Sequence, residues 1–413
     1  MKRKSLLILS LFMLALVTSI ATVAVRAQDV VTLTYWDTYS DPENAQFAKL
    51  IELFEKDNPG IKIEPTQYAY NDFKQAILTA IAGGEAPDTI RMDIGWVPQF
   101  AQQEALLQLD TAIPDFKTVA DGVFPGPLAT NYYDGKYWGL PLDTNTQVLL
   151  WNKDLFTKAG ITDAPKTVAE FVDDACKLTD GTKQYGYALG GTYFWAPAPL
   201  FYTMGGKIVD DKVTTADGYV NGKESVAAFQ TILDLYKKGC ISPNVLGGGI
   251  GTAEGHATGL YAMIIDGPWM VDIYKKDYPD FKVNFAPIPA GADGKNSSVV
   301  GGEDIVVSAT TAHQAEALTW VNFLMSEKAQ LFMAQVGVVP TLKSLVGNKD
   351  LPSYFDIFMT QLATAQARVA HPKWDDMDSA INAAFTKVLK GEAEVQPALD
   401  EAAKTIDALL VAK

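Results

Sequence analysis

The stretch VTLTYWD at residues 31–37 begins the pattern that decides the fold. Its β-branched and aromatic residues alternate in a way that is typical of a strand with one buried face. The sequence DPE at 41–43 then predicts the start of a helix, with Asp41 as the N-cap and proline in the first turn. Apolar residues at helical spacing continue this helix to Phe54, and NPG at 58–60 ends it.

The alternation of strand and helix continues to residue 93. IKI at 61–63 begins a second strand, residues 71–82 form a second amphipathic helix, and PDTIRMD at 87–93 is a third strand. This order predicts a largely parallel, doubly wound sheet of the α/β class. Ligands bind such sheets beyond the carboxyl ends of the strands, which are here Trp36-Asp37 and Asp93.

Similar patterns occur along the rest of the chain. A capping box at 167–170 predicts a helix start, 223–238 a long amphipathic helix, and 261–265 and 299–308 two further strands. The tail from about residue 354 is predicted to be helical. A length of 413 residues suggests two or three domains, or two lobes, each large enough to bury a core.

The composition is that of a globular, acidic protein. The chain has 34 basic and 49 acidic residues, a net charge of −15, and 48% hydrophobic residues. Binding to phosphates or to an anionic membrane surface needs clustered Lys and Arg, so this balance argues against nucleic acid and membrane partners. The three histidines, His256, His313 and His371, lie far apart in the sequence, which leaves little material for a histidine-based metal site.

The N-terminus indicates export. A basic start at residues 1–4, an uncharged apolar run at 5–25 and the small residues Val25 and Ala27 predict a secretory signal peptide at 1–27. The apolar run would also serve as an uncleaved anchor, because about 20 apolar residues span a bilayer. No cysteine lies near the cleavage site, which argues against an acylated lipoprotein.

The cysteine count agrees with an exported protein. Cys176 and Cys240 are the only two cysteines, and an exported chain with two cysteines is a candidate for one disulfide. The bridge would close a loop of roughly 64 residues and contribute about 4 kcal/mol in the chain-entropy model. The alternative is a pair of buried free thiols.

Several catalytic motifs are missing from the sequence. It contains no P-loop, no complete dinucleotide fingerprint, no G-x-S-x-G nucleophile elbow and no H-E-x-x-H. No cofactor or metal is therefore predicted. A retaining glycosidase cannot be rejected by counting alone, since its two carboxylates can come from any of the 49 acidic residues.

Tryptophan occurs next to acidic residues at several predicted element ends. Trp36-Asp37 and Asp93 with Trp96 follow strands, Trp269 follows a Gly-Pro turn, and Trp374 precedes two aspartates. The apolar face of a sugar ring stacks on indole, and its hydroxyls donate well to carboxylates. The alternatives are core packing for each tryptophan and helix N-capping for the aspartates.

Seven stretches carry a resemblance to a known family. They are LTYWD at 33–37, APDTI at 86–90, YWGLP at 137–141, LLWNK at 149–153, PKT at 165–167 with EF at 170–171, MIIDGPW at 263–269 and GG at 301–302. In this order and spacing the chain resembles the family 1 extracellular solute-binding proteins, the maltose-binding-protein-like receptors of ABC sugar importers. The resemblance implies a two-lobed periplasmic-binding-protein fold of type II, in which each lobe is a doubly wound sheet flanked by helices and a strand hinge joins the lobes.

The resemblance, together with the strand and helix pattern, also implies domain limits. The first lobe is expected to hold 29–142 plus 297–340, and the second 143–296 plus 341–413. The implied ligand contacts come from strand ends, the hinge and the second lobe: Trp36, Asp37, Asp93, Trp96, Asp143, Asn145, Trp195, Trp269, Gly302 and Glu303. Trp374 joins them as a candidate because two acids follow it.

The leading interpretation is a non-enzymatic receptor that binds a sugar or oligosaccharide between its lobes and delivers it to a membrane permease. Relatives often carry an aromatic or neutral polar residue where Glu303 stands, so a cationic solute such as a polyamine or an amino sugar is the alternative. A secreted carbohydrate-active enzyme is a third class. The receptor is expected to be a monomer in the periplasm or at the cell surface, where an uncleaved N-terminus would anchor it.

Overall fold

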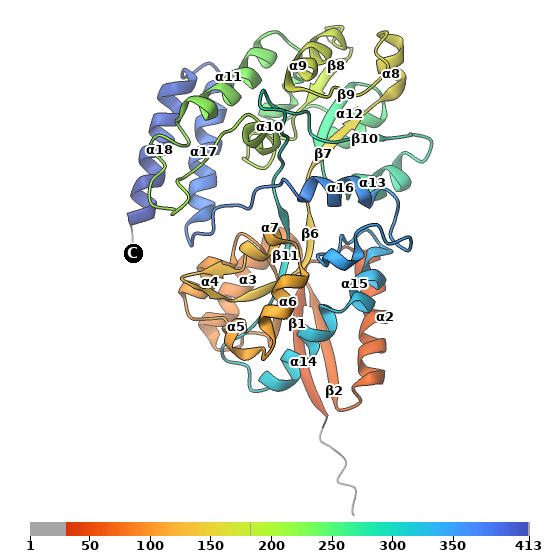
Figure 1. The fold of residues 1–413 in the computed structure, drawn as a ribbon, viewed down its shortest axis with the longest axis vertical. Coiled ribbons are helices and arrows are strands. Elements are labelled where there is room, and N and C mark those ends of the chain that lie inside the picture. The colour runs from red at the N-terminus through yellow and green to blue at the C-terminus, as the bar shows by residue number, and fades with distance from the viewer. Residues whose placement is uncertain (1–29, 182, 412–413) are drawn as a thin grey trace, which may run out of the picture.

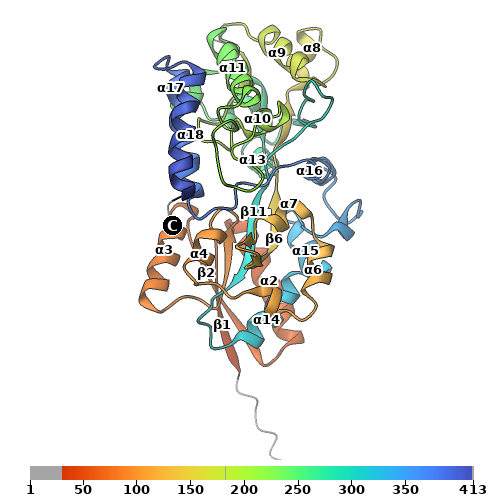
Figure 2. The same cartoon turned by 60° about the vertical axis from the view of Figure 1, so that its left-hand side comes forward.

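The structure is a computed structural model that describes residues 30–181 and 183–411. It has two α/β lobes, one below the other in Figure 1, with β6 and β11 between them. The view in Figure 2 shows the same two lobes from the side, with the C-terminal helices on the upper one. The two-lobed α/β fold predicted from the sequence is confirmed; the signal peptide predicted at 1–27 lies outside the described residues.

The first lobe is built on a five-stranded sheet of order β2-β1-β3-β11-β6. Strands β1, β2 and β3 are parallel, as the β-α-β-α-β pattern predicts, whereas β11 runs antiparallel to both of its neighbours. The strands are β1 (Val31–Asp37), β2 (Ile61–Gln67), β3 (Thr89–Asp93), β6 (Gly139–Asn145) and β11 (Gly301–Val307). A register shift between Glu303 and Asp304 marks the interruption that the glycine pair predicts in β11.

Helix α2 (Asp41–Asp57) begins one residue earlier than the sequence suggests. Its N-cap is Ser40, not Asp41, and the backbone N–H of Ser40 donates to the carboxylate of Glu43 at 2.7 Å. Serine in this position with glutamate three residues later is a capping box, in which the glutamate satisfies a backbone donor at the helix start. Asp41 instead contributes its negative charge to the first turn, where the helix dipole favours it.

The remaining elements of this lobe pack around the sheet. They are α3 (Tyr70–Gly83), α4 (Val97–Gln102), α5 (Leu109–Ala112), α6 (Phe116–Gly122), α7 (Pro125–Ala129), α14 (Gln314–Leu324), α15 (Glu327–Ala334) and the hairpin β4 (Tyr132–Tyr133) with β5 (Lys136–Tyr137). Trp320 of α14 is fully buried against Tyr35 of β1 and Phe54 of α2. The segment after β11 thus returns to the core that the N-terminal strands begin.

The second lobe is built on a four-stranded sheet of order β10-β7-β9-β8. Strand β8 is parallel to β9, and β7 is antiparallel to both β9 and β10. The strands are β7 (Val148–Trp151), β8 (Tyr185–Ala188), β9 (Tyr261–Asp266) and β10 (Asn284–Ala286). Each sheet therefore has one reversed strand, and that strand lies beside a point where the chain crosses between the lobes.

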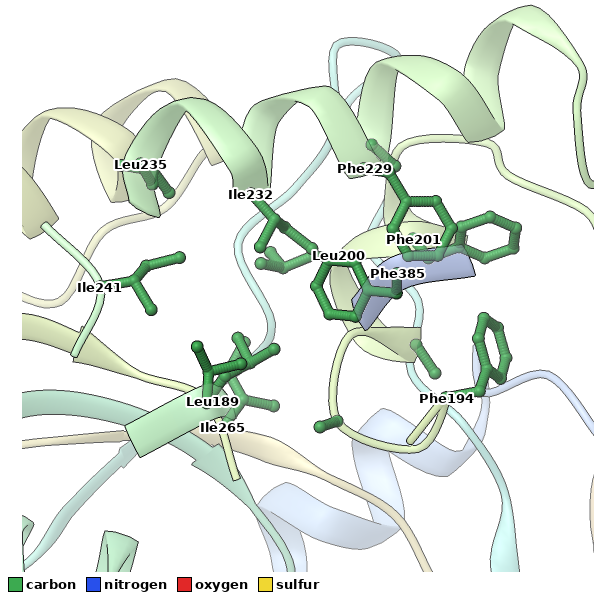
Figure 3. Packing of buried hydrophobic residues seen from close by; sticks show 14 of the residues in the cluster. Leu189, Phe194, Leu200, Phe201, Phe229, Ile232, Leu235, Ile241, Ile265 and Phe385 are labelled. Carbon is green, nitrogen blue, oxygen red and sulfur yellow. The ribbon is translucent and has the colours of Figure 1, made fainter. Parts of the chain in front are cut away.

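Helices enclose the second sheet and supply most of its core. They are α8 (Lys153–Lys158), α9 (Val168–Lys177), α10 (Ala198–Thr203), α11 (Lys223–Lys237), η1 (Pro243–Leu246), α12 (Thr252–Ala257), α13 (Met270–Asp277), η2 (Lys343–Leu345), α16 (Phe355–Leu362), α17 (Trp374–Leu389) and α18 (Val395–Val411), of which η2 lies on the connection from the first lobe. Figure 3 shows Phe229 of α11 above Phe201 of α10 and Phe385 of α17, with ring centroids 5.6 and 4.9 Å away. The helical tail predicted from the sequence thus completes this core.

The disulfide predicted from the cysteine count is present. Cys176 near the end of α9 is bonded to Cys240, which follows α11, across a sequence separation of 64 residues. The bridge ties the end of α9 to the segment that follows α11.

Three segments run side by side between the lobes, and two of them connect the lobes. The first follows β6 and the second precedes β11, and the Thr146 hydroxyl donates to the carbonyl of Val299 at 2.8 Å. The segment between α16 and α17 runs beside these two, and there the carbonyl of Gln366 accepts from the N–H of Val300 at 2.8 Å. The domain limits given above stay a prediction, but these crossings fix where residues of both lobes come together.

Candidate functional site

A cavity of about 520 Å³ lies between the lobes, next to the crossing segments. Eight of the eleven residues predicted from the sequence line it: Asp93, Trp96, Asn145, Trp195, Trp269, Gly302, Glu303 and Trp374. The lining also includes Tyr70, Tyr193, Phe194, Val299, Arg368, Asp375, Asp378 and Ser379. Concave sites with aromatic walls and a few placed polar groups are typical of small-molecule binding.

Two pairs of aromatic rings face the cavity from opposite lobes. In the first lobe, Tyr70 stacks on Trp96 with centroids 5.6 Å apart. In the second lobe, Trp195 and Trp269 lie 6.3 Å apart and are inclined by 34°. Trp269 follows the end of β9 and exposes 39% of its surface, whereas Trp96 exposes 7%. The exposed indole is therefore the one that a ligand reaches most easily.

Trp374 combines a site position with a core position. It begins α17, exposes 5% of its surface and meets Phe194 edge-to-face at 6.4 Å. Its ring also belongs to the hydrophobic core of the second lobe. Trp374 thus lies in the core and also lines the cavity, so its predicted ligand contact stays a prediction.

Asp93 organises the first-lobe side of the cavity. Its Oδ1 accepts from the N–H of Gly95 at 2.7 Å and from Nη1 of Arg368 at 3.1 Å, and its Oδ2 accepts from the hydroxyl of Tyr70 at 2.8 Å. The guanidinium of Arg368 also lies 5.4 Å from the Trp195 ring centroid. Arg368, which comes from the segment between α16 and α17, therefore links a first-lobe acid to a second-lobe ring.

Glu303 is also paired within the protein. Its Oε2 accepts from Nη2 of Arg91 at 2.7 Å, and the same guanidinium binds both carboxylate oxygens of Asp143, at 2.9 and 3.1 Å. Burial raises the pKa of Glu303 well above its ordinary value, and the positive charge of Arg91 opposes that rise. Arg91 thus holds two of the predicted site acids with one buried cation.

The acids on the second-lobe side are less enclosed. Asp375 forms an ion pair with Lys74 of α3, which joins the two lobes at the rim of the cavity. Burial raises the pKa of Asp378, and the charge of Arg368 opposes the rise. Most of the negative charge around the cavity is therefore balanced by cations of the same chain.

Three of the predicted residues do not line this cavity. Trp36 packs on Tyr68 at 4.7 Å, beside the core of the first lobe. Asp37 is completely buried, its Oδ1 accepts from the N–H of Tyr39 at 3.0 Å, and burial raises its pKa to about 6. Asp143 lines an adjoining groove of about 820 Å³, which also contacts Tyr70, Asn145, Trp269 and Glu303. The loop after β1 covers the strand end that the sequence suggested as a binding edge.

The prediction from the sequence missed several lining residues. Tyr70 precedes the predicted start of its helix, and Arg368 lies in an irregular segment between helices, so neither is near a recognisable motif. Tyr193 and Phe194 directly precede Trp195 and were within reach of the same resemblance. Arg91 lies two residues before Asp93 on the same face of β3, a spacing that would have indicated a cation beside the predicted acids.

Comparison with known proteins shows the family. A model of the bacterial extracellular solute-binding proteins matches residues 39–331 of the chain. The chain belongs to this family. The resemblance to extracellular solute-binding proteins that the sequence carries is thereby confirmed for this solute-binding protein.

Relatives and solved structures cover nearly the whole of this solute-binding protein. The galactooligosaccharide-binding protein of Bacillus subtilis is 27% identical over 398 residues, which cover 92% of the chain and 90% of the relative. The GacH receptor of Streptomyces glaucescens, solved without ligand and in complex with acarbose, is 26% identical with a TM-score of 0.79 and covers 92% of this chain and 98% of its own. A solute-binding protein of an ABC transporter from Thermotoga lettingae, bound to α-D-tagatose, is 27% identical with a TM-score of 0.79 and covers 92% and 100%.

Across residues 30–181 and 183–411, no helix is long and apolar enough to cross a membrane. In the same described part of the chain, no three His, Cys, Asp or Glu side chains lie in a group that would hold a metal ion.

Proposed function

We propose that this protein is the substrate-binding receptor of an ABC importer and that it binds an uncharged sugar or oligosaccharide in the cavity between its lobes. The cavity offers indole and phenol rings for the apolar faces of sugar rings, and carboxylates, amides and a guanidinium for their hydroxyls. The relatives named above, which bind galactooligosaccharide, acarbose and tagatose, support this ligand class.

The pairing of the cavity carboxylates carries the proposal. Asp93 is paired with Arg368, Glu303 with Arg91, and Asp375 with Lys74. A cationic ligand would compete with these internal cations and gain less, because these three acids already have a cationic partner. A neutral polyhydroxy ligand can instead use the remaining lone pairs of the acids and the remaining donors of Arg368. The structure therefore favours the sugar over the polyamine or amino-sugar alternative.

Delivery to a permease and the absence of catalysis belong to the same proposal. The family consists of binding proteins, and ligand that contacts both lobes would favour their closed arrangement by its differential affinity for that state. A retaining glycosidase needs one carboxyl group to act as nucleophile and another to act as acid. Asp93 is poorly placed as a nucleophile, because both of its oxygens accept hydrogen bonds from the protein.

Thermal-shift measurement with a defined panel tests the proposed ligand class. The panel holds D-tagatose, acarbose, maltotriose and galactotriose as neutral sugars or sugar analogues, with D-glucosamine and spermidine as cations. A ligand at 100 times its Kd should add about 2.7 kcal/mol to the free energy of unfolding, so the melting temperature of the protein should rise clearly. Shifts with spermidine or glucosamine alone would overturn the proposal, and consumption of an oligosaccharide during the incubation would indicate an enzyme.

Two tryptophan variants locate the binding surface. With a sugar that binds, Trp269→Ala should weaken affinity by about 2 kcal/mol or more in calorimetric titration, since deletion of a central aromatic anchor costs at least this much. Trp36→Ala is the matched control, because Trp36 is a half-buried tryptophan outside the cavity. Equal losses in the two variants would contradict the site.

A further inference from the structure

The indole of Trp269 lies directly over the backbone of Gly267. A Cβ atom added at Gly267 would stand 2.1, 2.2 and 2.6 Å from Cη2, Cζ3 and Cε3 of Trp269, which is far inside van der Waals contact. The backbone of Gly267 is not in the left-handed region, so the turn itself does not require glycine. The glycine is needed for the space that the ring occupies.

Two more aromatic rings of this wall lie close to a glycine. A Cβ at Gly191 would stand 2.6 Å from Cε1 of Tyr193, and a Cβ at Gly301 of β11 would stand 2.1 Å from Oδ1 of Asn145 and 2.7 Å from Cη2 of Trp195. Asp266 fixes the turn from its other side, because its Oδ1 accepts from the N–H of Gly267 at 2.8 Å. Pro268 then limits the backbone between the glycine and the indole.

We propose that Gly267 is the positioning residue of the binding wall: it lets the Trp269 indole settle on the backbone and so sets the ring opposite Trp195 before ligand arrives. The inference rests on the proposed function for its effect on affinity, but the ring position itself is a property of the free protein. A ring held in place in advance loses less conformational freedom on binding, and this increases affinity without a new contact. Gly267 thereby determines which ring plane the wall offers to a ligand.

The substitution Gly267→Ala tests the position of the Trp269 ring separately from the stability of the fold. Trp269 is a large side chain that exposes 39% of its surface, so its ring can rotate toward solvent and away from the new methyl group at little cost to the fold. We expect an unchanged melting temperature but a displaced indole. Gly122→Ala is the matched control, because no atom of residues 30–181 and 183–411 outside its own turn lies within 4 Å of a Cβ at Gly122, and its backbone is also outside the left-handed region.

Circular dichroism of the free protein reads the ring position directly. The Trp195 and Trp269 rings are close enough to couple, and the difference between the spectra of the parent protein and Trp269→Ala isolates the contribution of Trp269. Gly267→Ala should lose most of this difference signal, while Gly122→Ala should keep all of it. A signal that survives in Gly267→Ala would overturn the inference, whether or not any sugar binds.

A double-mutant cycle measures how the position of the Trp269 ring affects the affinity for a sugar. Whichever of acarbose, D-tagatose and galactotriose binds the parent protein most tightly serves as the probe. Gly267→Ala should weaken its affinity about tenfold in the parent protein and not at all in the Trp269→Ala background, because the glycine acts through the indole. An equal loss in both backgrounds, or an unchanged affinity in Gly267→Ala alone, would refute the positioning role. Binding of none of these probes would refute the proposed function and leave the spectrum to decide the position of the ring.

Discussion

The charge balance of the cavity depends on the buried side chain of Arg91, and its removal gives the sharpest test of that balance. The guanidinium serves Asp143 with two hydrogen bonds and Glu303 with one, and it lies 4.3 Å from the Tyr39 ring centroid. The substitution Arg91→Met keeps much of the packed volume and leaves both carboxylates without their cation. Breaking a buried ion pair by removing one partner costs about 3–5 kcal/mol, so the free energy of unfolding near neutral pH should fall by that amount.

The cost should become smaller as the pH falls. Burial raises the pKa of Glu303 in the parent protein, so the stability linked to this group is present below its ordinary pKa and is lost as the pH rises through the raised pKa. Without Arg91, whose charge lowers that pKa, the rise should be larger. The variant should therefore regain stability in acid by binding a proton at Glu303.

Urea unfolding at about pH 7 and about pH 5 measures both effects. Lys117→Met is the matched control: it removes a cation from the exposed ion pair with Asp121, and such pairs contribute only about 0–1 kcal/mol. Arg91→Lys keeps the charge but not the two-pronged geometry, and it should lie between the parent protein and Arg91→Met. A loss below about 1 kcal/mol in Arg91→Met, or a loss that is equal at the two pH values, would refute the reasoning.

Three further predictions concern the framework around the cavity. Reduction of the Cys176–Cys240 bridge should lower the free energy of unfolding by about 4 kcal/mol, measured by urea unfolding with and without a thiol reductant, and an unchanged midpoint would contradict it. Burial lowers the pKa of His256 to about 3, so the stability linked to this group is present above its ordinary pKa of 6.5 and is lost as the pH falls. Between about pH 8 and pH 5, urea unfolding should therefore show that the parent protein loses about 2 kcal/mol more stability than His256→Gln. Trp320→Ala should cost about 3–5 kcal/mol of stability in a melt and leave the sugar Kd unchanged in calorimetric titration, since Trp320 is a core residue; a weaker Kd at full stability would reverse that assignment.

The fold could be predicted from the sequence where the signals were local. The alternation at residues 31–37, the proline and glycine that end the first helix, and the periodicity of 223–238 depend on neighbours within a few positions, and each element lies where it was expected to within a few residues. The N-cap at Ser40 differs by one residue because serine and aspartate are both good caps, and only the bond from Ser40 to Glu43 decides between them. Local chemistry therefore predicts the element, and a specific hydrogen bond fixes its end.

The candidate site could be predicted only in part, for a related reason. Trp269 could be predicted because its signal, the end of a strand followed by Gly-Pro, is contained in residues 266–269. Arg368 could not be predicted, since it lies between α16 and α17 and its partner Asp93 is 275 positions away in the sequence. Asp37 was assigned to a binding edge by a general rule for parallel sheets, whereas the loop that follows β1 and the neighbouring Arg91 enclose its carboxylate. Residue types were readable from the sequence, but their partners were not.

Whether the cavity suits a charged or a neutral ligand depends on the partners of its acidic residues, and not on the acidic residues alone. Glu303 considered alone favoured an amine, because an unpaired carboxylate in a cleft attracts a cation. The antiparallel register of β11 and β3 places Glu303 opposite Asp93, and Arg91 lies one pleat further along β3, within reach of Glu303. A shift of that register by one residue would turn the side chain of Glu303 to the other face and remove the pairing. The proposed preference for a neutral ligand therefore depends on strand register, which a list of site residues does not contain.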